Sequence, residues 1–201
     1  MPHRIHLAKD KKLKPIVERV ELPKLATRKN AYYELTSCIM SQQLNVKVAR
    51  IIEERFLALF GKKVPTPQQV LDTPVETLRS AGLSLQKATY IHNIAKFAVE
   101  QGIETRRLNK MSNEEVIAYL TQIKGVGRWT VEMLLMFCLG REDVFSAGDY
   151  GVMSAITELY KLDASDKKKQ HEKAHKIAAK WAPYRTYACM YLWRYRDNAP
   201  K

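Results

Sequence analysis

The sequence has few cysteines and no long apolar run. Its three cysteines, Cys38, Cys138 and Cys189, are far apart in apolar helical contexts, which argues against disulfides and metal clusters and predicts buried thiols. The longest apolar stretch, residues 131–139, is far shorter than the roughly 20 residues that span a bilayer. The first ten residues lack the apolar core and cleavage site of a secretory signal. We therefore expect an intracellular protein without a membrane segment.

Acidic residues are scarce relative to basic ones. Lys and Arg number 34 and Asp and Glu number 21, which leaves a formal charge of +13. This is the sign expected of a protein that binds a polyanion, and nucleic acid is the leading candidate. Because soluble proteins also carry basic charge for colloidal reasons, charge alone leaves the partner open. A hydrophobic content of 46% is ample for a packed core and argues against disorder.

Apolar residues recur at helical spacing along the chain, and no segment shows the pattern of a strand. Thr66-Pro67 and Thr73-Pro74 each place a capping hydroxyl before a proline, and Ser112 with Glu115 forms a capping box. Helix stops are expected at Gly61, Gly82, Gly102 and Gly140. The pattern predicts an all-α fold with a basic N-terminal arm to about residue 29. Helices are expected at 30–40, 45–60, 67–72, 74–81, 85–101, 113–122, 129–139, 150–160, 167–181 and 184–197.

The most informative segment is a helix that breaks at Gly125-Val126-Gly127 and restarts at once. Glycines permit a tight turn and leave backbone amides uncovered, so that the next helix can present N–H groups to a phosphate. Lys124 and Arg128 flank this position. The alternative is a purely structural turn between two helices with a glycine cap, which is the commoner meaning of an isolated Gly-x-Gly.

A lone carboxylate, Asp149, follows 24 residues after Gly125, between an apolar run and the start of a helix. By itself this pattern indicates a helix N-cap. The segments Ile123-Lys-Gly-Val-Gly-Arg-Trp-Thr130 and Asp143-Val-Phe-Ser-Ala-Gly-Asp149 together resemble the helix-hairpin-helix (HhH-GPD) DNA glycosylase superfamily. Their tryptophan and spacing are most similar to AlkA-type 3-methyladenine DNA glycosylase II. Residues 39–47 and 181–193 resemble two further family segments, and the similarity spans about residues 31–196.

The resemblance implies a two-lobed helical enzyme with a DNA- and base-binding cleft between the lobes. A domain over residues 30–201 would contain a middle lobe at about 45–122, the hairpin at 113–139 and a terminal lobe at about 140–201, and the basic arm 1–29 would be part of the terminal lobe. The implied function is monofunctional hydrolysis of the N-glycosidic bond of alkylated purines such as 3-methyladenine and 7-methylguanine in damaged duplex DNA, which initiates base excision repair. Asp149 would be the catalytic carboxylate that stabilises positive charge on the sugar.

Excision requires an extruded base, and therefore an aromatic pocket and a wedge. The resemblance places Trp129, Trp193, Met133 and Tyr150 at the base pocket, with plain core aromatics as the alternative for the two tryptophans. Met133 stands where related enzymes carry a tyrosine, so the lesion range stays open. The wedge would be Gln43 with Leu44, unless these side chains are buried or face a turn. The implied DNA contacts are Lys124, Gly125, Val126, Gly127, Arg128 and Thr130.

Two rival functions are a bifunctional glycosylase and lyase of the endonuclease III type, and a non-catalytic DNA-damage binder. Trp129 stands where the bifunctional relatives carry a nucleophilic lysine, and three scattered cysteines cannot form their iron–sulfur cluster. The resemblance implies no required cofactor, but a Na⁺ or K⁺ ion at the carbonyls of Thr121, Ile123 and Val126.

The lysine-rich run 166–176, which contains His171 and His175, predicts a solvated helix face with long-range attraction to DNA rather than a metal pair. We expect a monomer, located in the cytoplasm or nucleoid of a bacterium or the nucleus of a eukaryote. The amino-terminal β-domain of some related enzymes is not expected in the roughly 30 residues that precede the similar region.

Overall fold

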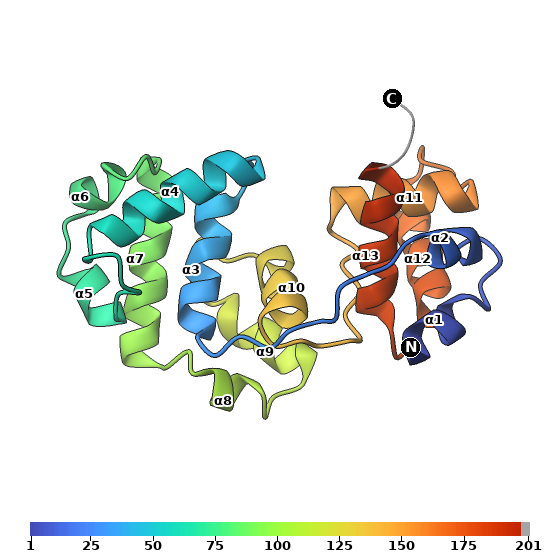
Figure 1. Ribbon diagram of the computed structural model, residues 1–201, viewed down its shortest axis with the longest axis horizontal. Coiled ribbons are helices and arrows are strands. Elements are labelled where there is room, and N and C mark those ends of the chain that lie inside the picture. Colours follow the sequence, from blue (N-terminus) through green and yellow to red (C-terminus); the bar gives the residue numbers. More distant parts are fainter. Residues whose placement is uncertain (198–201) are drawn as a thin grey trace. The chain divides into compact units, whose positions relative to one another are not determined.

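The computed structural model describes residues 1–197, which form thirteen helices and no strand (Figure 1). The expected all-α class is confirmed. Contacts divide the chain into two compact units. Residues 1–25 together with the chain from Gly140 onward form one, here called the terminal unit, and Ala26–Leu139 form the other, the central unit.

The terminal unit contains both ends of the described chain. Its helices are α1 (Pro2–Leu7), α2 (Lys14–Arg19), α11 (Tyr150–Tyr160), α12 (Lys167–Ala179) and α13 (Arg185–Asp197). Helix α11 packs against α12 and α13, and α2 packs against α13. Asp10 ties the amino-terminal segment to the rest of the unit by accepting hydrogen bonds from the Tyr160 hydroxyl at 2.7 Å and the Trp181 indole at 3.0 Å.

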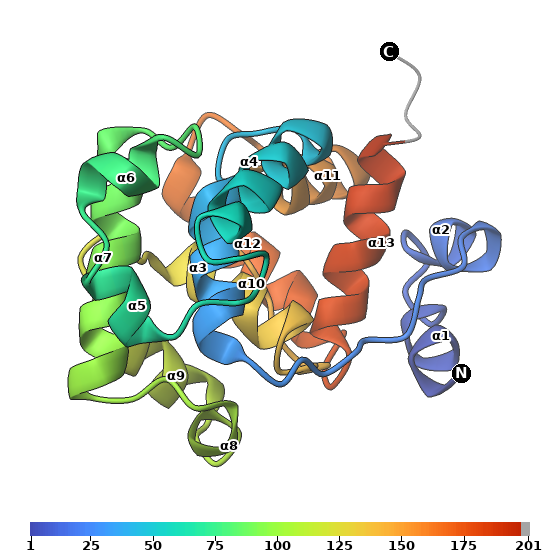
Figure 2. The ribbon, with the colours of Figure 1, turned by 60° about the vertical axis from the view of Figure 1, so that its left-hand side comes forward.

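The central unit is built around α7, its longest helix, which packs against α3, α5 and α6 (Figures 1 and 2). One side of α7 buries Ala88, Ile91, Ile94 and Ala95 completely, because these residues recur at helical spacing. Helix α10 packs against α3 and α9. The helices are α3 (Ala31–Ser41), α4 (Val46–Ala58), α5 (Pro67–Leu71), α6 (Val75–Arg79), α7 (Leu85–Glu100), α8 (Thr105–Leu108), α9 (Asn113–Leu120) and α10 (Arg128–Phe137).

The ten expected helices are all present, with bounds within two residues of expectation. The basic arm contains two helices that were not predicted, α1 and α2, which bury apolar side chains such as Leu7 and Val17. These helices, like the missed α8, are short and lack the side-chain cap that marks the equally short α5 in the sequence. The expected glycine stops all adopt left-handed backbone conformations.

Two of the three predicted helix starts are confirmed. Capping boxes form at Thr66 and at Ser112. The start at Thr73-Pro74 is wrong, since Pro74 is the N-cap of α6 and the Thr73 hydroxyl donates instead to the Gln69 carbonyl at 2.7 Å.

Cysteine burial is confirmed for Cys138 and Cys189, whereas Cys38 is partly exposed. Within residues 1–197, no helix combines the length and apolarity needed to cross a membrane.

Candidate functional site

Asp149 is the N-cap of helix α11 in the terminal unit. Its backbone is extended, with φ −79° and ψ 122°, and its Oδ1 atom accepts the Val152 N–H at 2.8 Å. The capping interpretation is therefore confirmed. The cap also fixes the carboxylate at the helix N-terminus, where the partial positive charge of the helix dipole stabilises a negative group.

Trp193, on α13, donates its indole N–H to the same Oδ1 atom of Asp149, also at 2.8 Å. A hydrogen bond to a charged group contributes about 1.5–3 kcal/mol. Gly151 makes this approach possible, because a Cβ atom there would lie 2.9 Å from Cδ1 of Trp193 and 3.0 Å from Oδ1 of Asp149. Sequence reasoning missed Gly151, although a glycine within a helix is unfavourable enough to signal a packing reason.

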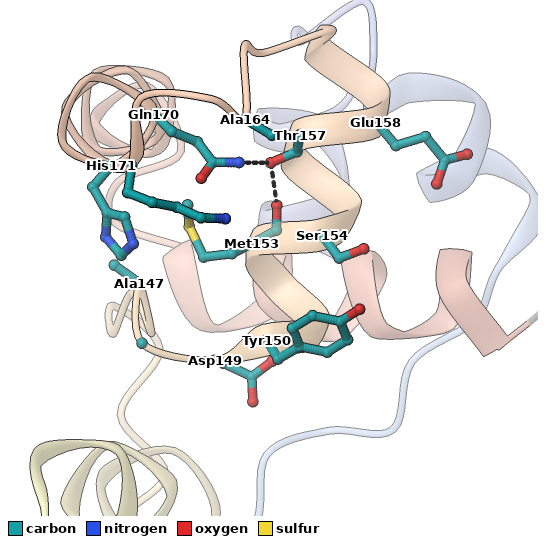
Figure 3. A pocket seen from close by; sticks show the side chains of 12 residues that line it. Ala147, Asp149, Tyr150, Met153, Ser154, Thr157, Glu158, Ala164, Gln170 and His171 are labelled. Carbon is teal, nitrogen blue, oxygen red and sulfur yellow. Dashed lines mark hydrogen bonds between the residues drawn. The ribbon is translucent and has the colours of Figure 1, made fainter.

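A cavity of about 580 Å³ lies beside Asp149, between α11 and α12 (Figure 3). Gln170 reaches into it from α12 and donates to the Thr157 hydroxyl at 2.7 Å. His171 also lines this cavity, and both His171 and His175 are exposed, as a solvated helix face requires. No potential metal site with three or more His, Cys, Asp or Glu side chains occurs within residues 1–197.

Tyr150 projects from the start of α11 and is 78% exposed. The guanidinium carbon of Arg196 lies 5.0 Å from the centre of its ring, a cation–π arrangement. Tyr150 is therefore an exposed aromatic surface directly beside the carboxylate of Asp149.

Residues 121–127 join α9 to α10 in the central unit, as the hairpin prediction requires. Gly125 has φ +104°, and a Cβ atom there would collide with the ring of Tyr90. Glycine is the residue that meets both demands. The Asn93 amide, one turn along α7, donates to the Lys124 carbonyl at 3.0 Å. Sequence reasoning did not identify Tyr90 or Asn93, because nothing local marks a contact with a loop about 30 residues away.

The start of α10 has no side-chain cap. Its N-cap, Gly127, has φ −92° and ψ 166°, and a Cβ atom there would meet nothing within 4 Å. The expectation that Gly127 is needed for a tight turn is wrong, since any residue adopts this backbone. Gly127 supplies no side-chain cap to α10, and Lys124, three residues before it, is exposed; a helix N-terminus near a cation suits an anion.

Arg128 was expected to contact a DNA phosphate, and in the structure its guanidinium binds two carboxylates. Its guanidinium donates to both oxygens of Glu114, at 2.6 and 3.0 Å, and to Glu132 at 3.0 Å. The hydrogen bond to Glu114 is the main reason that the pKa of Arg128 lies above its ordinary value. Arg128 therefore links α9 to α10.

Two other expected DNA contacts have buried side chains. Thr130 is 2% exposed and Val126 is 4% exposed. The Thr130 hydroxyl accepts the Gln42 side-chain amide at 3.1 Å, and the Val126 N–H donates to the Ile123 carbonyl at 2.9 Å. Both side chains face the interior of the central unit, so the expected DNA contact, which stays a prediction, would use backbone atoms at these two residues.

Trp129 and Met133 lie one turn apart on α10 and therefore share a helix face. Trp129 is 37% exposed and Met133 is partly exposed, so the core-aromatic alternative is wrong for Trp129. Both residues belong to the central unit, whereas Asp149 and Trp193 belong to the terminal unit. Trp193 is also partly exposed.

Gln43 lies in the turn between α3 and α4 and has a left-handed backbone, with φ +58°. This conformation costs a non-glycine residue about 1–2 kcal/mol. The side chains of Gln43 and Leu44 are exposed, Leu44 at 36%. The buried alternative for the predicted wedge is therefore wrong, and the turn presents two adjacent side chains to solvent.

Comparison with known proteins places the chain in a family. Residues 36–182 match the model of the HhH-GPD superfamily base excision DNA repair proteins. The chain belongs to this superfamily.

Curated proteins and solved structures of this superfamily are similar to the chain. DNA-3-methyladenine glycosylase 1 of Schizosaccharomyces pombe is 39% identical over 169 residues, which are 83% of this chain and 73% of that protein. A structure of the S. pombe 3-methyladenine DNA glycosylase in complex with abasic DNA has a TM-score of 0.86 and 34% identity, and covers 99% of this chain and 98% of that one. The DNA-3-methyladenine glycosidase of Bacillus halodurans has a TM-score of 0.83 and 35% identity, covering 98% and 90%.

The region of this HhH-GPD protein that matches the family model includes the α3–α4 turn, the hairpin and Asp149, but ends before Trp193. The hydrogen bond from Trp193 to Asp149 thus joins the family region to the last helix. The hairpin and carboxylate motifs correctly predicted the family that the comparisons show.

Proposed function

We propose that this protein is a monofunctional DNA N-glycosylase that releases alkylated purines, of the 3-methyladenine and 7-methylguanine type, from damaged duplex DNA and so initiates base excision repair. The observation that carries this proposal is Asp149, a carboxylate held by two hydrogen bonds of 2.8 Å in a chain 39% identical to a DNA-3-methyladenine glycosylase.

Asp149 would act by stabilising positive charge on the sugar. The bond between C1′ and the purine nitrogen breaks, and the base leaves with the bonding electrons, which neutralises the positive charge of the alkylated ring. The sugar becomes oxocarbenium-like and is stabilised by the nearby carboxylate. Water then bonds to C1′ and releases a proton, which Asp149 or solvent accepts, leaving an abasic site.

Four side chains are expected to contact the extruded base. Trp129 and Met133 offer an indole and a thioether from α10, while Trp193 and Tyr150 lie beside the carboxylate. An electron-rich indole face attracts a purine with a formal positive charge, which favours alkylated over normal bases. The exposed pair Gln43 and Leu44 would fill the gap that the extruded nucleotide leaves.

The hairpin would bind the DNA backbone. The N-terminus of α10, which has no side-chain cap, and the Lys124 ammonium suit a phosphate oxygen, which fixes the enzyme's position on DNA without reading sequence. A Na⁺ or K⁺ ion would be held by the carbonyls of Thr121, Ile123 and Val126 and would add positive charge beside this phosphate. The Ile123 carbonyl accepts one N–H and retains a second lone pair for such an ion.

The proposed enzyme is a monomer that needs no organic or redox cofactor and acts on the chromosome, in the bacterial nucleoid or the eukaryotic nucleus. Trp129 cannot form a Schiff base with the sugar, so strand cleavage is not expected.

Incubation with methylated duplex DNA, followed by chromatography of the released bases, tests the proposal. We expect free 3-methyladenine or 7-methylguanine, intact strands until alkali is added, and no covalent enzyme–DNA adduct with borohydride. An adduct would instead support the bifunctional alternative. Tight binding to damaged DNA without release of any base would support the non-catalytic alternative.

A further inference from the structure

Helix α7 contacts two separate turns of the central unit through three of its side chains. Lys87, Tyr90 and Asn93 follow one another at intervals of three residues, so each is a neighbour of the next on the helix surface. Lys87 contacts the end of α3, whereas Tyr90 and Asn93 contact the hairpin at Gly125 and Lys124. The helix is long and buries Ala88, Ile91, Ile94 and Ala95 in the central unit, so it provides a rigid support for both turns.

Lys87 closes the end of α3 with two strong contacts. Its ammonium donates to the Met40 carbonyl at 2.9 Å and to the Gln42 carbonyl at 2.7 Å. Carbonyls at a helix C-terminus lack partners within the helix and carry partial negative charge, so a cation is favourable there. Partial burial lowers the pKa of Lys87 below its ordinary value.

The residue after Gln42 is Gln43, whose left-handed backbone is unfavourable for a side chain of this kind. Such a conformation persists where its surroundings fix it. Lys87 fixes the carbonyl on one side of Gln43, and the Gln42 side chain is itself bound to Thr130 of α10 at 3.1 Å. The turn is thus held from α7 and from α10.

We infer that Lys87 is a positioning residue for base extrusion: it holds the Gln43 turn in the geometry that enters the DNA, while Tyr90 and Asn93 hold the phosphate-binding hairpin on the same helix. This inference rests on the proposed function of Gln43 and of the hairpin. Helix α7 then fixes the distance between the Gln43 side chain, which enters the DNA, and the phosphate bound at the hairpin.

The test compares one lesion in two settings. Single-turnover base release is measured on duplex DNA with the lesion paired normally, and on the same duplex with the lesion opposite a stable abasic analogue, where extrusion costs less. Lys87→Met should slow release from the paired lesion by about tenfold to a hundredfold, the loss typical of a misplaced group, and should leave release from the unpaired lesion largely unchanged. Lys87→Arg, which keeps the charge, should restore much of the rate.

Lys96→Met is the matched control, because Lys96 is an exposed lysine on the same helix, paired with Glu100; it should match the wild type on both substrates. In a Gln43→Ala background, Lys87→Met should cause little further loss, since residues that act as a unit are non-additive.

Equal loss on both substrates would overturn the inference and leave Lys87 a merely structural residue. Unchanged release from both substrates would also overturn it. If the wild type releases no base, the proposed function fails, and the inference is then decided by fluorescence of 2-aminopurine beside an abasic analogue on binding. A smaller increase in 2-aminopurine fluorescence with Lys87→Met than with Lys96→Met supports the inference. Equal increases in fluorescence with the two variants overturn it.

Discussion

The contact between Gly151 and Trp193 predicts that one added methyl group will impair catalysis. In Gly151→Ala, the new Cβ atom would lie 2.9 Å from Cδ1 of Trp193 and 3.0 Å from Oδ1 of Asp149. Carbon atoms normally approach to about 3.5 Å, so the indole must move by about 0.6 Å. This movement stretches the 2.8 Å hydrogen bond to Asp149, and a displacement of about 1 Å at a reacting group can cost about a hundredfold in rate. We therefore expect base release to slow about tenfold to a hundredfold.

Stability should change little in this variant, because alanine within a helix gains about 0.5–1 kcal/mol over glycine and offsets part of the lost hydrogen bond. The assay is single-turnover release of base from methylated duplex DNA, with thermal unfolding measured in parallel. Gly148→Ala is the matched control, since a Cβ atom there meets nothing within 4 Å. Full activity in Gly151→Ala, or equal loss in Gly148→Ala, would refute the reasoning.

Three other substitutions test separate parts of the account. Gln43→Gly relieves the left-handed backbone at φ +58° and should raise the free energy of unfolding by up to about 1 kcal/mol while slowing base release; lower stability in urea would contradict the assigned strain. Lys124→Ala should weaken binding to damaged and undamaged DNA alike and reduce the slope of log affinity against log salt by about 1; an unchanged slope would exclude a phosphate contact. Burial lowers the pKa of His3, which stacks on Tyr187 at 3.9 Å. The unfolded chain therefore gains a proton near its ordinary pKa of about 6.5 before the folded chain does, and stability falls as the pH drops below that value. His3→Phe should flatten the fall in urea-unfolding free energy between pH 7 and 5.5, and an unchanged fall would assign it to another group.

The fold was largely predictable because helical periodicity and capping residues are local signals. The capping box at Ser112 and the hairpin at Gly125 depend on residues within a few positions of one another, and both are present as predicted. Helices α1 and α2 escaped notice because they lack the side-chain cap that marks the equally short α5. Their burial depends on packing against distant parts of the terminal unit.

The site residues were predictable only where they belong to a sequence motif. Asp149 lies in such a motif, and its cap is formed by the next residues along the chain. Contacts between distant segments were not predictable, such as Lys87 with Gln42 across 45 positions or Arg128 with Glu114. Because a basic residue beside a glycine turn can face either DNA or a carboxylate, only the packed structure distinguishes the two for Arg128.

The central claim is that Asp149 is the catalytic carboxylate of a base-releasing enzyme. The most direct test measures release of free base from methylated duplex DNA by the wild type and by Asp149→Asn, with binding to an abasic-site analogue recorded in parallel. Asparagine can still cap α11, so the fold and DNA binding should persist. We predict release by the wild type, and loss of release with retained binding in the variant. Release at the wild-type rate by Asp149→Asn, or no release by either protein, would contradict the account.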